Sequence, residues 1–250
     1  MEFRPCIDIH NGQVKQIVGG SLRDQGDFAK ENFVSQMAAA DYARLYRDQG
    51  LRGGHIILLN GKDSPYYEAD VRQAKGALEA WPGALQIGGG VNGQNAREWI
   101  QAGASHVIVT SYVFVDGQIR YDRIEELVET VGKDHLVLDL SCRLRDGAYY
   151  VVTDRWQKFT DQALDRDLIH KLASYCDEFL VHAVNVEGSQ AGVDLDLIDL
   201  LASAADLPMT YAGGVGSMED MEKIRRQGAG KVNVTVGSAL DLFGGQLSFQ

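Results

Sequence analysis

The sequence predicts an α/β fold, a (β/α)8 barrel made of two similar halves, with residues 1–250 forming one barrel. Three observations support this prediction. Short apolar runs alternate with amphipathic helical windows, and 250 residues is the usual size of eight such units. Motifs of the first half also recur roughly 125 residues later, which indicates a duplicated half-barrel. An open doubly wound sheet is the alternative, although such sheets more often contain fewer strands.

The expected strands are mostly continuous apolar runs, which is typical of parallel strands covered on both faces. They cover residues 3–9, 55–59, 84–87, 106–110, 135–140, 178–183, 208–211 and 231–234. The helical windows between them cover residues 33–49, 67–81, 95–102, 123–131, 164–175, 195–204 and 217–227.

Two stretches interrupt this alternation. Residues 19–30 are polar and contain glycine, so we expect a long loop after the first strand. Residues 141–161 contain Asp146 and Gly147 between apolar flanks, and Asp-Gly in such a setting predicts a β-hairpin. Long loops in a compact domain are usually functional, so we expect this hairpin to form a lid after strand five.

The internal repeat pairs residues of three kinds in the same order along both halves: a glycine after a strand, a threonine at a strand end and an aspartate at a strand end. The pairs are Gly89 with Gly213, Thr110 with Thr235, and Asp8 with Asp139. One such coincidence could arise by chance, but three in order favour duplication.

The glycine clusters suggest two phosphate sites. Each follows a strand and precedes a helix, where glycine lets backbone N–H groups approach an anion closely. In barrels a phosphate site typically lies after strands seven and eight, and the repeat predicts an equivalent site after strands three and four. The residues of the first site are Gly89, Gly90, Thr110 and Ser111, and those of the second are Gly213, Gly214, Gly237 and Ser238. The alternative is that the glycines only make tight turns.

Asp8 and Asp139 are the candidate catalytic residues. Both lie at C-terminal ends of strands, on the face where barrel active sites form, and the half-barrel symmetry places them on opposite sides of the mouth. Two carboxylates in different environments can act as acid and base. Helix caps or salt bridges are the structural alternatives.

Two further side chains, Trp156 and His182, have both a functional and a structural interpretation. Trp156, in the hairpin loop, could stack on a flat ligand ring or anchor the hairpin. His182 ends strand six among apolar neighbours, so we interpret it as a core histidine. Because no metal-ligand cluster and no GxGxxG after a strand occurs, we expect neither a metal nor another cofactor.

Composition excludes some classes of binding partner. A net charge of -11 without a basic stripe argues against nucleic acid, and no apolar run is long enough to span a membrane. Three cysteines without a CxxC, and a first segment unlike a signal peptide, predict free thiols in a cytoplasmic protein. We expect a monomer.

Taken together, these motifs resemble a known family, the phosphoribosylformimino-aminoimidazole carboxamide ribotide isomerases of histidine biosynthesis, especially their fungal and plant branch. The similarity extends over essentially the whole chain. It is carried by CIDIHNGQVKQ at 6–16, GGGV at 88–91, VLDLSCR at 137–143, YAGGV at 211–215 and GSALDLFGG at 237–245.

The resemblance implies an Amadori rearrangement of an aminoaldose to an aminoketose, with a bisphosphate ribotide as the small-molecule partner. It implies that Asp8 is the base that removes the C2 proton and that Asp139 is the acid that opens the furanose ring. It assigns Trp156 to stacking on the substrate, and the two glycine clusters to its two phosphates.

The sequence departs from the bacterial-type pattern at three places. Gln16 replaces an arginine, so we expect a positive contact from elsewhere, with Lys15 the candidate. Ala183 replaces a threonine, and strand two ends in Leu59, Asn60 and Gly61 without the usual acidic residues.

Three other functions stay open. The cyclase subunit of imidazole glycerol phosphate synthase shares the repeat, the aspartates and the phosphate sites. An isomerase that also processes phosphoribosyl anthranilate is a second rival, and a non-catalytic barrel that binds a phosphate ligand is a third.

Overall fold

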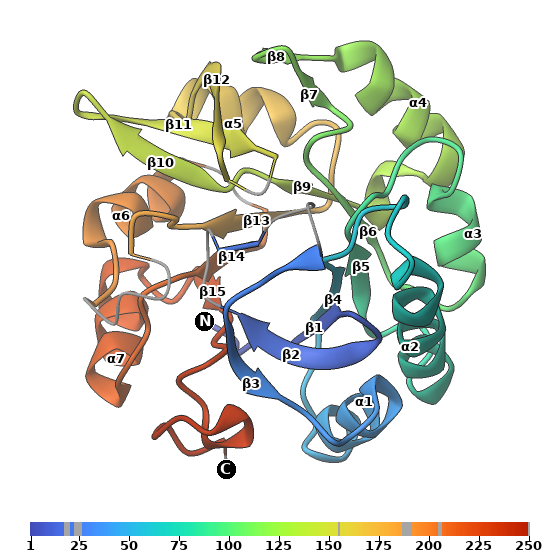
Figure 1. Ribbon diagram of the computed structural model, residues 1–250. Helices are drawn as coiled ribbons and strands as arrows, with labels where there is room; N and C mark the ends of the chain where they lie inside the picture. The colour runs from blue at the N-terminus through green and yellow to red at the C-terminus, as the bar shows by residue number, and fades with distance from the viewer. Residues whose placement is uncertain (18–20, 23–26, 155, 187–191, 205–206, 250) are drawn as a thin grey trace.

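Eight parallel strands form a ring surrounded by helices in the computed structural model (Figure 1), which describes residues 1–17, 21–22, 27–154, 156–186, 192–204 and 207–249. The ring strands are β1 (Cys6–His10), β4 (His55–Leu58), β5 (Gln86–Gly88), β6 (Val107–Val109), β9 (Leu136–Asp139), β13 (Glu178–His182), β14 (Met209–Ala212) and β15 (Val232–Val234). Each corresponds to one of the eight expected strands.

The ring closes between the first and last of these strands. Neighbouring strands pair in the order β15-β14-β13-β9-β6-β5-β4-β1, always in parallel. Phe3, just before β1, bridges Val234 of β15 in parallel. The Arg4 N–H donates to the Val234 carbonyl at 2.8 Å, and the Val234 N–H donates to the Glu2 carbonyl at 3.0 Å. The expected (β/α)8 barrel is therefore confirmed.

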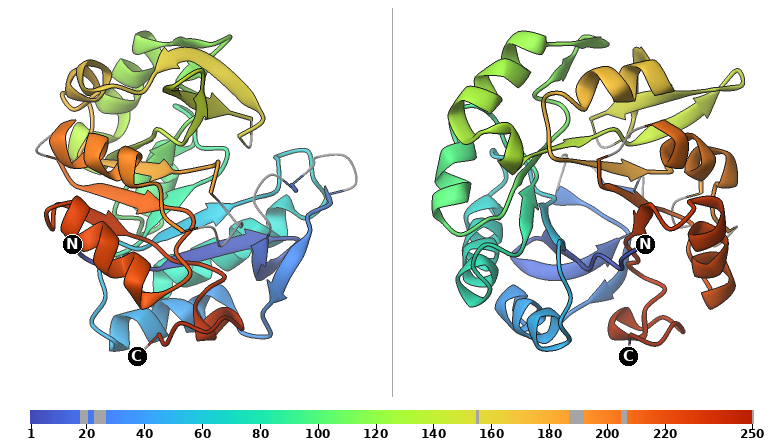
Figure 2. Two further views of the ribbon diagram at one scale, coloured as in Figure 1. Left: turned by 90° about the vertical axis from the view of Figure 1, so that its left-hand side faces the viewer. Right: turned by 180° about the vertical axis from the view of Figure 1, so that it is seen from behind.

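Helices cover the outside of the ring (Figures 1 and 2). They are α1 (Ala39–Asp48), α2 (Tyr67–Ala80), α3 (Ala96–Gln101), α4 (Tyr121–Val131), α5 (Arg166–Leu172), α6 (Leu195–Ala204) and α7 (Met218–Gln227). Two begin at N-cap side chains, Asp165 for α5 and Ser217 for α7, which accept the Leu168 and Asp220 N–H groups. A short 3-10 turn (Asp241–Phe243) follows β15 in place of an eighth α-helix. In the part of the chain that the structure describes, no helix has the length and apolar character needed to cross a membrane.

Alternation along the strands separates two apolar layers. Residues that point outward, such as Ile7 and Ile9, are fully buried beneath the helices. Residues that point inward pack in the middle of the ring, where Ile108, Val137 and Leu180 form a buried cluster joined by Ile57. Because these side chains fill the interior of the barrel, it has no pore, and a ligand can bind only at an end of the barrel.

The prediction of a helix over 33–49 was wrong at its start. Residues 31–34 form a strand, β3 (Glu31–Val34), which pairs antiparallel with β2 (Gln13–Ile17), and β2 pairs antiparallel with β1. Phe33 packs edge-on against Phe243 with ring centroids 5.8 Å apart, so its apolar side chain is used by the C-terminal turn and not by a helix face. The expected loop at 19–30 lies between β2 and β3, and its residues 19–20 and 23–26 are outside the described residues.

The expected hairpin after strand five is confirmed and extended to three strands. They are β10 (Cys142–Arg145), β11 (Ala148–Thr153) and β12 (Lys158–Ala163), in the antiparallel order β10-β11-β12. Asp146 and Gly147 both have positive φ, 51° and 81°, as a two-residue type I′ turn requires. A smaller hairpin, β7 (Phe114–Val115) with β8 (Gln118–Ile119), follows β6.

Candidate active site

The two candidate catalytic aspartates lie on opposite sides of the ring. Asp8 is on β1 and Asp139 ends β9, and three strands separate them in either direction around the sheet. Figure 1 looks onto the end of the barrel toward which the strands run, and Figure 2 (left) shows the N-terminus at the other end. Both side chains are partly exposed, as groups that meet a ligand must be.

Asp8 contacts a residue of the antiparallel strand β2. The Gln16 Nε2 donates to Asp8 Oδ2 at 3.4 Å, and only 5% of the surface of Gln16 is exposed. A Cβ placed on Gly237 would lie 2.2 Å from Gln16 Oε1, so this amide lies directly against the second glycine cluster. Gln16 therefore bridges the first candidate aspartate and the second candidate phosphate loop.

Lys15 does not supply the positive contact expected near Asp8. Its ammonium group bonds to the Glu31 carboxylate of β3, and the side chain is 5% exposed. Lys15 and Gln16 are successive strand residues and point to opposite faces. The interpretation of Lys15 as a substitute for arginine was therefore wrong; the side chain beside Asp8 is the neutral amide of Gln16.

Asp139 is held by Ser141, two residues further on. Both the backbone N–H and the hydroxyl of Ser141 donate to Asp139 Oδ1, the former at 2.8 Å. Ser141 is completely buried. Ala183 has no hydroxyl to offer, and the hydroxyl that Asp139 accepts from belongs to Ser141.

His182 adjoins this cluster and is partly exposed, so it is not enclosed in the core as interpreted, although its ring nitrogen does have a hydrogen-bond partner. Its Nδ1 lies 3.1 Å from Ser141 Oγ, and its backbone N–H donates to the same oxygen at 3.2 Å. The Trp156 ring lies over the imidazole with centroids 5.1 Å apart and planes tilted by 41°. Sequence reasoning missed the bond between Ser141 and His182 because these residues are 41 positions apart, and for Asp139 the local signal was a serine two residues further on.

The first glycine cluster follows β5 and lies beside the end of β6. Gly89 has a φ of 97°, and a Cβ there would lie 2.1 Å from the Leu58 carbonyl, so only glycine fits. Within the described residues, the N–H groups of Gly90 and Ser111 form no hydrogen bond with the protein. Unpaired N–H groups on adjacent strand ends can bind an anion.

The second cluster has the same construction. Gly213 and Gly214 follow β14 with φ values of 115° and 74°, and a Cβ on Gly214 would lie 2.1 Å from the Gly192 carbonyl. Gly237 and Ser238 follow β15, the adjacent strand. In the described part of the chain, the N–H groups of Gly214, Gly237 and Ser238 also lack protein partners. Strands β5 and β6 lie opposite β14 and β15 in the ring, so the two glycine clusters face each other.

The three-stranded sheet after β9 reaches across this mouth. Gln157 Nε2 donates to the Leu22 carbonyl of the first loop at 3.3 Å, and the Asp154 N–H donates to Ser111 Oγ at 3.5 Å. Together with Trp156 over His182, these contacts connect the lid to the first loop, to Ser111 beside the first glycine cluster, and to β13. The predicted lid is thus in contact with both halves of the barrel.

A buried polar cluster holds the turn between β1 and β2. Asp70 at the start of α2 accepts the Gly12 N–H at 2.7 Å, and Asn60 accepts the Asn11 N–H at 2.7 Å. Burial raises the pKa of Asp70 to about 6, although the Gly12 N–H and Lys15 oppose this shift. Asn60, one of the departures noted above, thus has a structural use at the end of β4.

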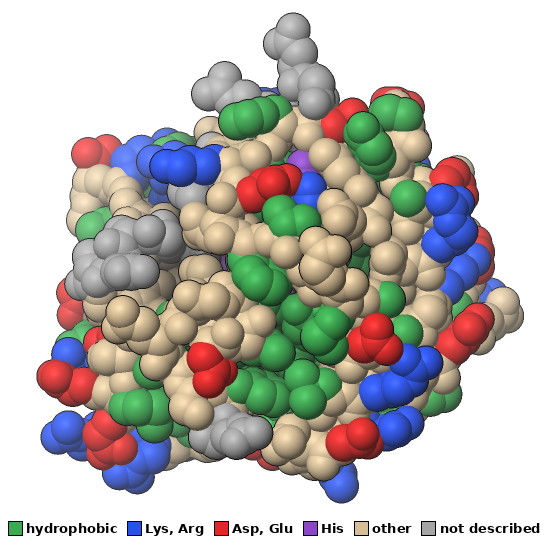
Figure 3. Space-filling view, turned by 60° about the horizontal axis from the view of Figure 1, so that its bottom comes forward, with side chains coloured by type: hydrophobic (Ala, Val, Ile, Leu, Met, Phe, Trp, Pro, Cys, Tyr) green, Lys and Arg blue, Asp and Glu red, His purple; other side chains and the backbone are tan. Residues whose placement is uncertain are grey.

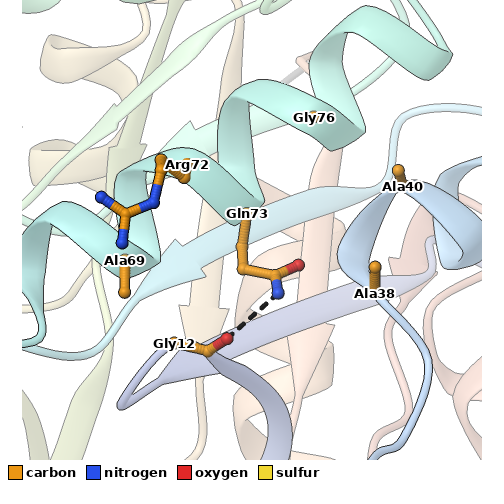
Figure 4. A pocket seen from close by; sticks show the side chains of 7 residues that line it. All are labelled: Gly12, Ala38, Ala40, Ala69, Arg72, Gln73 and Gly76. Atoms are coloured by element: carbon orange, nitrogen blue, oxygen red, sulfur yellow. Dashed lines mark hydrogen bonds between the residues drawn. The ribbon is translucent and has the colours of Figure 1, made fainter.

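A hollow of about 360 Å³ lies beside this turn (Figure 4). Gln73 points across it and donates to the Gly12 carbonyl at 3.0 Å. The other lining residues are mostly small: Gly12, Ala38, Ala40, Ala69, Arg72 and Gly76. It lies between α1 and α2 and therefore outside the ring, so it is separate from the two aspartates.

Charged side chains of both signs are interspersed on the face that Figure 3 shows. In Figure 3 acidic and basic side chains alternate along the edges of the visible face, while hydrophobic ones gather in its lower middle. No group of three or more His, Cys, Asp or Glu side chains suited to a metal ion occurs within the described ranges. An anionic ligand would therefore be held mainly by backbone N–H groups.

The fold and site define a (β/α)8 barrel with two opposed carboxylates and two opposed glycine clusters at its mouth. The model of the family described as histidine biosynthesis protein matches residues 2–247, and the chain belongs to this family. A Medicago truncatula protein, named as a chloroplastic 1-(5-phosphoribosyl)-5-((5-phosphoribosylamino)methylideneamino) imidazole-4-carboxamide isomerase, is 53% identical over all of this chain and 80% of its own length. Proteins of the same isomerase name from Neurospora crassa and Saccharomyces cerevisiae are each 44% identical over 98% of this chain, and over 93% and 94% of their own lengths.

Proposed function

We propose that this protein is the isomerase of histidine biosynthesis that converts the phosphoribosylformimino aminoimidazole carboxamide ribotide into its phosphoribulosyl form. The observation that carries the proposal is the opposed arrangement at the mouth: one aspartate and one anion site in each half. A substrate with a phosphate at each end can span the two anion sites and place its reacting sugar between the aspartates. The names of the relatives support the same reaction.

In this proposal Asp139 protonates the furanose ring oxygen, and the bond between that oxygen and C1 breaks to leave a protonated Schiff base. Asp8 then removes the proton from C2, and the electron pair forms an enolamine that tautomerises to the aminoketose. Each proton transfer of this kind is worth about 10²–10⁴-fold in rate. Trp156 stacks on the flat part of the substrate from the lid.

Several expectations remain predictions. We propose that the enzyme works as a monomer, as one barrel over 1–250, and without a metal or other cofactor. The cytoplasm is the compartment that composition suggests. The relative from Medicago truncatula is described as chloroplastic, so a plastid is a second candidate.

A steady-state assay with purified ribotide and no added cofactor tests the function. We expect turnover to the phosphoribulosyl product in the absence of ammonia. Ring closure that occurs only when ammonia is supplied would instead identify the cyclase subunit of imidazole glycerol phosphate synthase.

Phosphoribosyl anthranilate, added as a second substrate, tests for dual activity. We expect none, because the residue beside Asp8 is the neutral Gln16 and offers no charge to a carboxylate. Binding of the ribotide without any reaction would support the non-catalytic barrel.

A further inference from the structure

An array of one ring contact, between Trp156 and His182, and two hydrogen bonds links the lid to the candidate acid. From the lid inward it consists of Trp156, His182, Ser141 and Asp139, which come from three separate segments of the chain. Ser141 is fully buried, whereas His182 and Asp139 are partly exposed toward the mouth. The array therefore begins at a residue that the lid covers and ends at a carboxyl group that can meet substrate.

The donors of Ser141 distinguish the two oxygens of Asp139. The backbone N–H of Ser141 donates to Oδ1 at 2.8 Å, and its hydroxyl donates to the same atom. An oxygen that accepts two hydrogen bonds is the carbonyl-like oxygen of a neutral carboxyl group. When Asp139 is protonated, its proton is therefore on Oδ2, the oxygen not held by Ser141.

The same bonds determine the state of His182. Ser141 Oγ has one hydrogen, which Asp139 Oδ1 accepts, so the oxygen can only accept from its other neighbours. The two neighbours are the His182 backbone N–H at 3.2 Å and His182 Nδ1 at 3.1 Å. Nδ1 must then carry a hydrogen, and a neutral His182 has its bare nitrogen at Nε2.

We propose that Ser141 and His182 are positioning residues for Asp139, which orient its Oδ2 toward the substrate and connect its hydrogen bonding to the position of Trp156 on the lid. The proposal rests on the assignment of Asp139 as the acid of the isomerase reaction. As the Oδ2–H bond breaks and the sugar oxygen takes the proton, negative charge develops on the carboxylate. The two Ser141 donors stabilise that charge, so their benefit appears in the reaction step and not in substrate binding.

Kinetics of Ser141→Ala test this directly. The variant keeps the backbone donor and loses the hydroxyl, and we expect kcat to fall about 10- to 100-fold with KM within about threefold of wild type. Ser141→Thr restores a hydroxyl and should recover kcat to within about fivefold. If Ser141 served packing alone, Ser141→Thr would be the more damaged variant, because the extra methyl group of threonine enters a fully buried position. A fall in kcat for Ser141→Thr that equals or exceeds the fall for Ser141→Ala, at normal thermal stability, overturns the proposal.

His182→Phe tests the second member. It keeps a ring for Trp156 to pack on but has no Nδ1 donor, so we expect a fall in kcat of about five- to tenfold. Because both residues act through one hydroxyl, the double variant with Ser141→Ala should be no more than about twofold slower than Ser141→Ala alone. If the fall in kcat of the double variant equals the product of the falls in the two single variants, the two residues act independently and the idea of a single array is overturned.

A spectroscopic measurement checks the array without substrate. In protein labelled with ¹⁵N-histidine, two-bond proton–nitrogen correlations should show His182 with hydrogen on Nδ1, and Ser141→Ala should move it toward the Nε2–H form that free histidine favours. An Nε2–H form in the wild type overturns the proposal. Failure of the wild type to turn over the ribotide, with the Nδ1–H form present, would instead reject the proposed function and leave the hydrogen-bonded array in place.

Discussion

At the scale of single residues, Asp8 is the most consequential side chain of the proposed reaction. We expect Asp8→Asn to lower kcat by at least the 10²–10⁴-fold typical of a proton transfer, because an amide cannot accept the C2 proton. Affinity for the ribotide should stay within about tenfold, since the backbone N–H groups that hold the phosphates are unchanged. Kinetics with calorimetric binding measures both quantities.

The control for Asp8→Asn is Asp48→Asn at the exposed end of α1, which should retain wild-type activity. Near-normal turnover by Asp8→Asn would remove Asp8 from the mechanism. Loss of binding and turnover together would indicate that the carboxylate organises the site instead of reacting.

Gly89 can be compared with Gly83, another glycine that has a positive φ. Gly89 and Gly83 have φ values of 97° and 72°, so alanine costs roughly 1–2 kcal/mol of stability at either position. At Gly89 the new Cβ also lies 2.1 Å from the Leu58 carbonyl and forces the loop to move, whereas at Gly83 nothing lies within 4 Å. We expect Gly89→Ala to weaken ribotide affinity at least tenfold, by roughly 1.4 kcal/mol or more, and Gly83→Ala to leave it unchanged. Calorimetry on both variants checks this, and equal affinities would contradict the phosphate assignment of the first cluster.

At the scale of elements, the turn between β1 and β2 should respond to pH through Asp70. Its pKa in the folded protein is about 6, above the ordinary value of 3.8, so between these values the folded protein binds more protons than the unfolded chain. Stability therefore falls as pH rises from about 4 to about 6 and levels off above that, by up to about 3 kcal/mol. Asp70→Asn still accepts the Gly12 N–H and cannot ionise, so this fall should be absent from the variant.

Urea unfolding of the wild type and Asp70→Asn at several pH values between 4 and 7 measures the difference. Asp63→Asn, at an exposed position of the preceding loop, is the control and should follow the wild type. Parallel curves for wild type and Asp70→Asn across this range would show that the carboxyl group keeps its ordinary titration.

Elements also show what could be read from the sequence. The eight ring strands were predictable because parallel strands buried on both faces require unbroken apolar runs, and the lid turn was predictable because Asp146 and Gly147 tolerate positive φ. The strand at 31–34 could not be predicted, because Phe33 fits a helical pattern equally well. Its packing on Phe243 in the folded chain distinguishes the two. The role of His182 was missed for a related reason: its bond to Ser141 joins β13 to the loop after β9, 41 residues away, and residue spacing carries no information about such a contact.

At the scale of the whole molecule, the two ends of the barrel have separate tasks. The mouth carries the two aspartates and the two glycine clusters. The other end carries a buried polar layer in which Glu178 accepts hydrogen bonds from Arg4 at 3.4 Å, Gln86 at 3.1 Å and Thr210 at 2.8 Å. Arg4 also lies where the ring closes, because its N–H bonds to Val234. This layer should therefore contribute to stability and not to turnover.

Removing the Arg4 guanidinium tests that separation. Arg4→Met leaves the Glu178 carboxylate, whose side chain is 5% exposed, without its cation, and we expect a loss of about 3–5 kcal/mol in the free energy of unfolding. Adding Glu178→Gln removes the uncompensated charge while keeping an acceptor for Thr210, so the double variant should regain about half of that loss or more. Arg225→Met on the surface of α7 breaks an exposed pair and should cost less than about 1 kcal/mol. Urea unfolding measures these free energies. The kcat and KM of all three variants, measured well below their melting temperatures, should stay within about twofold of wild type. The reason is that the packed apolar cluster of the ring lies between this layer and the mouth. A large change in kcat for Arg4→Met without loss of stability would show that the two ends are coupled through the barrel.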